Sequence, residues 1–149
     1  MLAFGSLCLD PKVSWQPVLS AHNDNEIFKP DRYEFNDPIL ISSDGRLFNC
    51  RTRNLIAAKP NQKGYIRANL PKGKKTVTVY LHVMTAYFFC PNRRFVREVH
   101  HLNHKKHDNR ACNLLWCTPK EHDELHRLWD TDKKAYWRYV NQIRRENKW

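Results

Sequence analysis

The order of hydrophobic and polar residues predicts a β-rich first part of the chain and a more helical second part. Residues 1–32 show little periodicity and hold several turn-forming pairs, so we expect a mostly irregular arm there. From residue 33 the pattern becomes strand-like, because the runs 39–41 and 46–50 flank a turn sequence at 42–45. This region is therefore predicted to contain two short strands joined by a turn.

A second hairpin is predicted further along the chain. Residues 64–70 alternate apolar with polar positions, residues 71–74 have turn character, and residues 76–80 again favour a strand. The tip of this hairpin carries three lysines, Lys72, Lys74 and Lys75. Such a tip can be a solvated loop that keeps a sheet edge soluble, or a contact for an anionic partner.

Helical spacing follows the second hairpin. The segment His82–Phe89 predicts a helix, in which His82 itself is more typical of a packed side chain than of a ligand. Beyond it, residues 96–102 and 114–117 predict two short strands. The stretch 103–112 between them is too polar for a core and has the length of a functional loop.

Two further helices have well-marked beginnings. Thr118, Pro119 and Glu121 form a capping-box sequence with proline at the first helical position. The last helix is predicted at 133–147, after capping residues at 130–132. One apolar stripe marks its buried side: Tyr136, Val140 and Ile143.

Length and composition limit the classes of protein that fit. A chain of 149 residues with 41% hydrophobic content fits one compact domain. The sequence has no apolar run of the roughly 18 residues that a membrane span needs, and we expect a cytoplasmic protein without a membrane partner. The five cysteines are odd in number and far apart, which favours reduced thiols.

The positive charge is concentrated in the second part of the chain. The formal net charge is +11, yet residues 1–44 hold seven of the 15 acids and only three of the 26 bases. Between Asp44 and Glu98 twelve Lys and Arg occur with no acid. An acid-free block of this kind indicates an anionic partner, with nucleic acid first and an acidic membrane surface second.

Histidines are concentrated in the segment that follows. Six of the eight lie between residues 100 and 126. His122 and His126 are one helical turn apart, and His100 and His101 end the predicted strand. Adjacent residues on a strand point to opposite faces, which fits separate tasks for His100 and His101. Neutral imidazole suits a general base near pH 7 and is also a metal ligand.

These residues resemble those of a known family. The string V-H-H-L-N-x4-D-N-R-x2-N-L-x-W-x-T-x2-E-H at 99–122 resembles the HNH endonucleases, whose catalytic unit is a ββα-metal motif. Upstream, Tyr33, the segment 42–47, Gly64-Tyr65-Ile66 and His82 resemble the N-terminal module of phage-type HNH homing endonucleases. The resemblance covers about residues 33–126.

The resemblance implies roles for individual residues. His101 takes the place of the general base, and Asn113 that of the residue that orients this histidine or holds the loop. His100 and His122 take metal-binding places. Because the bacteriocin nuclease branch has a second helix ligand, we take His126 as a third or auxiliary ligand. One divalent ion is implied, Mg or Mn, with Ni, Co or Zn as alternatives because imidazole favours them.

The remaining histidines and cysteines of this segment receive plainer interpretations. We expect His104 and His107 to be solvated loop residues and Asp108-Asn109 to shape the loop. Cys112 and Cys117 are expected to be buried small side chains, because their spacing lacks the second pair of a structural zinc site.

The sequence thus predicts an α+β protein. Its expected units are an irregular arm at 1–32, a β-rich DNA-binding module at 33–94, a ββα-metal nuclease unit at 95–128 and a basic helix at 130–149. The expected partner is double-stranded DNA. Its contacts are predicted to be basic side chains of the acid-free window: Arg67, Lys72, Lys74, Lys75, Arg93 and Arg94.

The predicted function is metal-dependent hydrolysis of DNA phosphodiester bonds by a phage- or mobile-element-encoded enzyme acting in a bacterial cell, as a monomer or homodimer. One alternative is a catalytically inactive HNH-fold protein that only binds nucleic acid. A second alternative is a zinc-stabilised interaction domain that uses the cysteines.

Overall fold

The computed structural model describes residues 13–18 and 35–149, and it has the predicted α+β architecture. The first sheet is antiparallel, with the strand order β1-β2-β3-β4. Its strands are β1 (Trp15–Pro17), β2 (Ile39–Ser42), β3 (Leu47–Asn49) and β4 (Asn54–Leu55). The two strands predicted around the turn at 42–45 are thereby confirmed.

Strand β1 corrects the prediction of an irregular arm. Residues 15–17 pair with β2, and the Trp15 ring lies edge-on to Phe48, with 6.2 Å between the ring centroids. A strand of three residues is too short to show alternation, and its partner lies more than twenty residues away in sequence. Apart from residues 13–18, the predicted arm lies outside the described residues.

The second sheet contains the lysine-bearing hairpin. It consists of β5 (Lys59–Pro60), β6 (Ile66–Lys72) and β7 (Lys75–Tyr80), all antiparallel. The strands extend further than predicted, so that only Gly73 and Lys74 form the turn. Gly73 has a φ of +58°, which suits a tight hairpin turn. Its backbone N–H donates to the Asn36 side-chain oxygen, and the Asn36 side-chain NH₂ donates to the Gly73 carbonyl. The hairpin tip is thus anchored to the segment that precedes β2.

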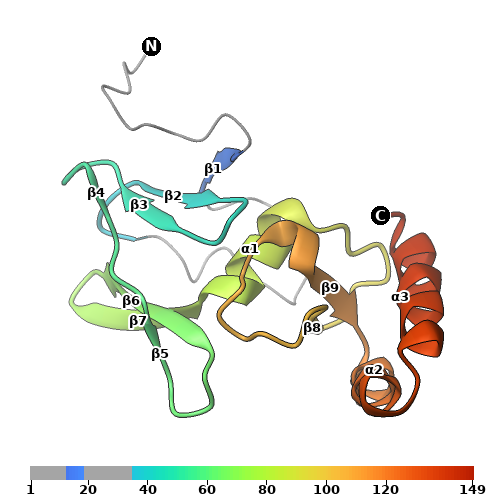
Figure 1. The fold of residues 1–149 in the computed structure, drawn as a ribbon. Helices are drawn as coiled ribbons and strands as arrows, with labels where there is room; N and C mark the ends of the chain where they lie inside the picture. Colours follow the sequence, from blue (N-terminus) through green and yellow to red (C-terminus); the bar gives the residue numbers. More distant parts are fainter. Residues whose placement is uncertain (1–12, 19–34) are drawn as a thin grey trace.

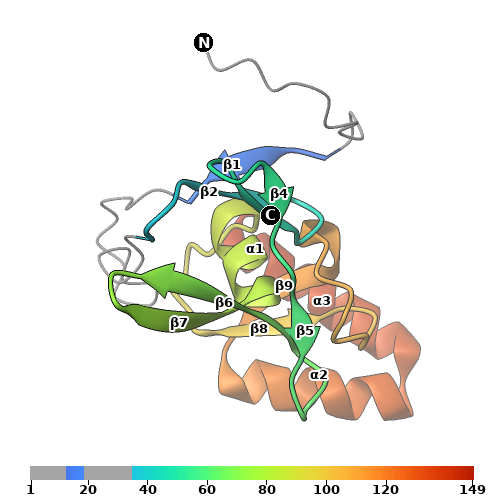
Figure 2. The ribbon, with the colours of Figure 1, turned by 90° about the vertical axis from the view of Figure 1, so that its left-hand side faces the viewer.

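The helix α1 (Leu81–Phe89) connects the two halves of the molecule and confirms the predicted helix. In Figure 1 it lies between the β-rich part and the C-terminal part, and Figure 2 shows the two sheets above and below it. Leu81 and Met84 are buried in a core shared with both sheets. Ala86 and Cys90 are buried in a second core with the following hairpin.

That following hairpin, β8 (Glu98–His101) with β9 (Leu114–Cys117), is buried on both faces. Val99, Leu114 and Trp116 pack towards α1, and the Trp116 indole donates a 3.2 Å bond to the Ala86 carbonyl. Leu115 and Cys117 pack towards the helices α2 (Pro119–Thr131) and α3 (Lys133–Asn147). Strand β8 is shorter than the strand predicted at 96–102, and the strand predicted at 114–117 is confirmed as β9.

The beginnings of both C-terminal helices agree with the sequence. Thr118 and Glu121 form the predicted capping box, and Asp132 accepts hydrogen bonds from the first backbone amides of α3. The predicted stripe Tyr136, Val140 and Ile143 is fully buried. Within the part of the chain that the structure describes, no helix has the length and apolar character to span a membrane.

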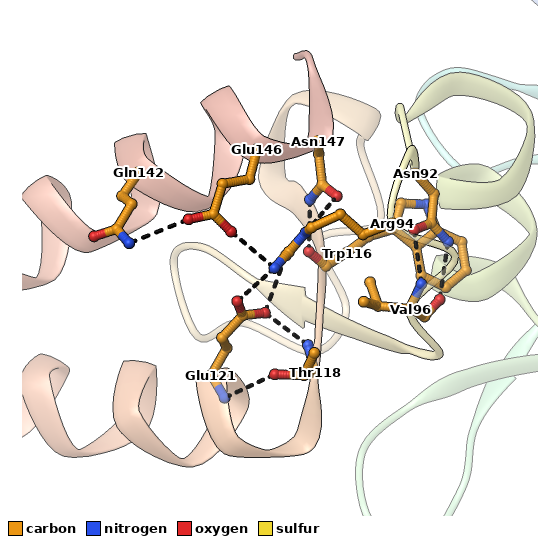
Figure 3. A network of polar contacts seen from close by, with 9 residues as sticks. All are labelled: Asn92, Arg94, Val96, Trp116, Thr118, Glu121, Gln142, Glu146 and Asn147. Atoms are coloured by element: carbon orange, nitrogen blue, oxygen red, sulfur yellow. Dashed lines mark hydrogen bonds and ion pairs between the residues drawn. The ribbon is translucent and has the colours of Figure 1, made fainter.

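Arg94 joins both helices to the connection between α1 and β8. Figure 3 shows its guanidinium between Glu121 of α2 and Glu146 of α3, at 2.6 Å and 2.9 Å. It also donates to Asn147, whose amide donates to the Trp116 carbonyl. Burial alone would raise the pKa of Glu121, but the hydrogen bonds from Arg94 and Thr118 lower it overall. We therefore remove Arg94 from the predicted DNA contacts.

Replacing Arg94 should destabilise the docking of α2 and α3. We expect Arg94→Met to lower the free energy of unfolding by about 1–3 kcal/mol, because two carboxylates lose a partly buried partner. Urea unfolding measures this, with the exposed neighbour Arg93→Met as the control, for which the change should stay within about 0.5 kcal/mol. Equal midpoints for both variants would contradict the role of Arg94.

Candidate metal centre

Three histidines from two elements meet in one cluster. His100 ends β8, and His122 and His126 lie one turn apart on α2. One ring nitrogen from each lies within 4.8 Å of the others. The structure therefore brings together the three predicted ligands, and three imidazoles are a donor set that suits a divalent transition metal. Their role as ligands stays a prediction.

The environment of His100 fits metal binding. Its Nδ1 is buried and has no hydrogen-bond partner among the described residues, whereas its Nε2 lies 3.1 Å from the Tyr136 hydroxyl. Burial lowers the pKa of His100 to about 2, so that the ring is neutral at pH 7. A neutral ring with one uncommitted nitrogen is what a metal ion requires.

His122 is oriented by an acidic side chain. Its Nδ1 lies 2.7 Å from a carboxylate oxygen of Glu98, which is the first acid after the acid-free window. The carboxylate accepts a hydrogen bond from Nδ1–H, and Nε2 of the neutral ring therefore keeps its lone pair. Metal-binding histidines are commonly held by a carboxylate in this way. Glu98 was not among the predicted site residues, although it lies two residues before His100 in the sequence.

His101 lies on the opposite face of β8. Its ring packs against His82 of α1 and against Tyr65, with centroids 5.1 Å and 6.1 Å apart. His82 is buried as predicted. The His101 Nε2 lies 3.0 Å from the side-chain oxygen of Asn109. Burial lowers the pKa of His101, and the hydrogen bond to Asn109 opposes part of this effect.

Asn113 supports the loop rather than His101. Its amide donates to Asn103 and to the Asp108 carbonyl, and its oxygen accepts from the Asn103 backbone. Of the two roles predicted for Asn113, this geometry favours holding the loop. Asn109 takes the orienting position, and the Cβ that Gly45 lacks would come within 2.7 Å of it. The turn at 42–45 therefore packs directly behind the residue that holds His101.

His104 corrects the prediction of a solvated loop residue. Its ring is stacked on Trp129, with centroids 4.2 Å apart, and lies 4.7 Å from the rings of His100 and His126. The backbone at His104 is in the left-handed conformation, with a φ of +57°. Such a turn has no clear sequence signal. His107 is exposed, as predicted.

The cysteines do not form a comparable cluster. Cys117 is buried, as predicted, and burial raises its pKa to about 12. Cys112 is exposed, contrary to the prediction, because it lies in the short turn η2 (Ala111–Asn113) before β9 begins. Within residues 13–18 and 35–149, the histidines supply the one group with metal-site spacing. The zinc-stabilised alternative therefore lacks support from the described cysteines.

One pocket connects the two histidine environments. It is lined by three residues of β8, two of α2 and three of the neighbouring loops: Val99, His100, His101, His122, His126, Tyr65, His104 and Lys106. The Lys106 ammonium lies 4.6 Å from the centre of the Tyr65 ring and donates to the Lys63 carbonyl. A positive charge is thus held beside the histidines.

Comparisons with known proteins agree with this geometry. No family model matches the chain. An uncharacterized HNH endonuclease of Acanthamoeba polyphaga mimivirus is 30% identical over 59% of this chain and 27% of its own length. A second uncharacterized HNH endonuclease of the same virus is 31% identical over 65% of this chain and 25% of its own length. The chain thus spans about a quarter of the curated relatives.

The fold is also found in a solved structure. The HNH homing endonuclease I-HmuI, described in a study of DNA binding and cleavage, matches with a TM-score of 0.61 and 23% identity. The match covers 89% of this chain and 66% of I-HmuI. The chain therefore shares the fold of this HNH homing endonuclease, and its sequence is similar to two proteins named as HNH endonucleases.

Removing His126 tests the third ligand. Because an imidazole nitrogen would be lost from the cluster, we expect His126→Ala to weaken binding of Ni²⁺ or Zn²⁺ by more than about tenfold. Calorimetric titration of the metal into the protein measures this, with the exposed His107→Ala as the control. Full metal affinity in His126→Ala would show that this histidine is not a ligand.

Proposed function

We propose that the chain is a metal-dependent DNA endonuclease that hydrolyses phosphodiester bonds. The observation that carries this proposal is the convergence of the histidine cluster and His101 on one pocket from opposite faces of β8. Hydrolysis of a phosphodiester needs an activated water and a stabilised leaving oxygen, and these two requirements match the two environments.

The first environment is the cluster of His100, His122 and His126, which would hold one divalent ion. When bound, such an ion neutralises charge on the phosphate and on the leaving 3′ oxygen. All three donors are nitrogens, which favours Mn, Ni, Co or Zn over Mg. The proposed cofactor is one ion of this group, with Mg as the oxygen-preferring alternative.

The second environment makes His101 a general base. With Asn109 accepting from Nε2–H, the Nδ1 of His101 keeps its lone pair and can take a proton from water. The rings of His82 and Tyr65 restrict its rotation, because both lie against it. Its lowered pKa keeps the base unprotonated at neutral pH.

The proposed substrate is double-stranded DNA, held by Lys106 at the pocket and by further basic side chains on the surface. Lys106 lines the pocket itself, and Arg67 is exposed on β6 of the neighbouring sheet. Arg93 is also exposed, and the hairpin tip carries its three lysines on an anchored turn. Phosphate contacts of this kind position a duplex without reading its sequence. The relatives by sequence are viral, and the predicted bacterial host and the oligomeric state remain proposals.

Replacing His101 should separate cleavage from binding. We expect His101→Ala to slow nicking of supercoiled plasmid by at least about a hundredfold, because the general base is lost, while DNA affinity is retained. The assay is run with Mg, Mn, Ni and Zn in turn, and His107→Ala is the control. A cleavage rate equal to wild type would refute the role of His101.

The same assay also tests the alternative function. Salt-sensitive DNA binding without nicking by the wild type, whichever ion is added, would favour a protein that only binds nucleic acid.

The hairpin lysines should contribute to DNA affinity through their charge. We expect replacement of Lys72, Lys74 and Lys75 by alanine to reduce the slope of log Kd against log salt concentration by about 2–3. Replacement of all three by arginine keeps the charge and should keep the slope. Fluorescence anisotropy with a labelled duplex measures both. An unchanged slope in the alanine variant would place the DNA elsewhere.

A further inference from the structure

We propose that Tyr136 of α3 is a positioning residue for the metal centre, because its hydroxyl selects the tautomer in which His100 presents Nδ1 to the ion. Tyr136 lies outside the segment that resembles the HNH family. The inference rests on the proposed metal binding by His100 and adds a partner from the C-terminal helix.

The hydrogen bonds around Tyr136 determine the tautomer. Its hydroxyl donates to the Leu102 carbonyl at 2.8 Å, and a hydroxyl has only one proton to give. The His100 Nε2 lies 3.1 Å from the same oxygen, so Nε2 must be the donor in that contact. In a neutral imidazole the proton on Nε2 leaves the lone pair on Nδ1.

The nitrogen that keeps its lone pair in this way is the ring nitrogen of His100 that has no hydrogen-bond partner in the described part of the chain. The His100 Nδ1 is buried and makes no hydrogen bond within the described residues. A buried polar atom without a partner is costly, and a metal ion would satisfy it. The ring of His100 lies 5.2 Å from that of His122 and 5.1 Å from that of His126.

Packing holds Tyr136 in this position. Its side chain is fully buried, and it shares a core with Leu115 and Val140. Its acceptor is equally fixed, because Leu102 follows β8 directly and its amide donates to the Asn113 carbonyl at 2.8 Å. The hydroxyl therefore has a defined place relative to both the strand and the loop.

The experiment compares two tyrosines of the same helix. Tyr136→Phe removes the hydroxyl and keeps the ring. Tyr139→Phe makes the same change at a half-buried position, in a separate surface pocket that Arg138 and Glu124 also line. Zn²⁺ and Ni²⁺ alone are titrated into each full chain by calorimetry. We expect Tyr136→Phe to weaken metal binding by about 10–100-fold, and Tyr139→Phe to bind as wild type.

A second measurement reads the tautomer without any variant. Long-range ¹H–¹⁵N correlations of metal-free wild type should show His100 with its proton on Nε2. In Tyr136→Phe the same spectrum should show a larger share of the Nδ1–H form. A proton on Nδ1 in the wild type, or wild-type metal affinity in Tyr136→Phe, would overturn the proposal.

The outcomes separate this inference from the proposed function. A wild type that binds metal in a Tyr136-dependent way but never cuts DNA supports the role of Tyr136 and contradicts the nuclease function. A wild type that cuts DNA, with metal affinity unchanged in Tyr136→Phe, supports the nuclease function and contradicts the role of Tyr136. A wild type that binds neither metal overturns this inference directly.

Discussion

The site depends on one constraint, which is that adjacent residues of a β-strand point to opposite faces. His100 and His101 are neighbours on β8, so they cannot both face the same layer of the molecule. The structure meets this constraint by burying both faces of the β8–β9 hairpin. The layer with α1 receives His101, and the layer with α2 and α3 receives His100. Because the hairpin lies between α1 on one face and α2 and α3 on the other, His100 and His101 have different neighbours although both line one pocket.

Three of the four imidazoles proposed to act at the site have a hydrogen-bond partner on one ring nitrogen, and these partners come from three different elements. Asn109 of the loop holds His101, Glu98 of β8 holds His122, and Tyr136 of α3 holds His100. An imidazole without such a partner could exchange its tautomer and turn its lone pair away. The hydrogen bonds therefore convert a group of histidines into a set with defined donor nitrogens.

Local sequence was enough to predict the helix beginnings and the strands that carry the histidines. The Thr118–Glu121 capping box and the i, i+4 pair on α2 depend only on near neighbours. The partners of the imidazoles were not predictable in this way, because Tyr136 reaches His100 across 36 positions. His104 was misjudged because its ring stacks on Trp129, which lies 25 positions away in the sequence. Strand β1 was missed because three residues carry no periodic signal.

Charge counting located the acid-free window but could not tell which cations face solvent. Arg94 belongs to that window by sequence, yet its guanidinium is neutralised by Glu121 and Glu146, which lie far beyond it. The window ends at Glu98, whose carboxylate contacts His122 of the candidate metal centre. The field available to a phosphate therefore comes from the cations that remain exposed, such as Arg67 and Arg93. The acid-free window thus ends at the first residue of β8, the strand that carries His100 and His101.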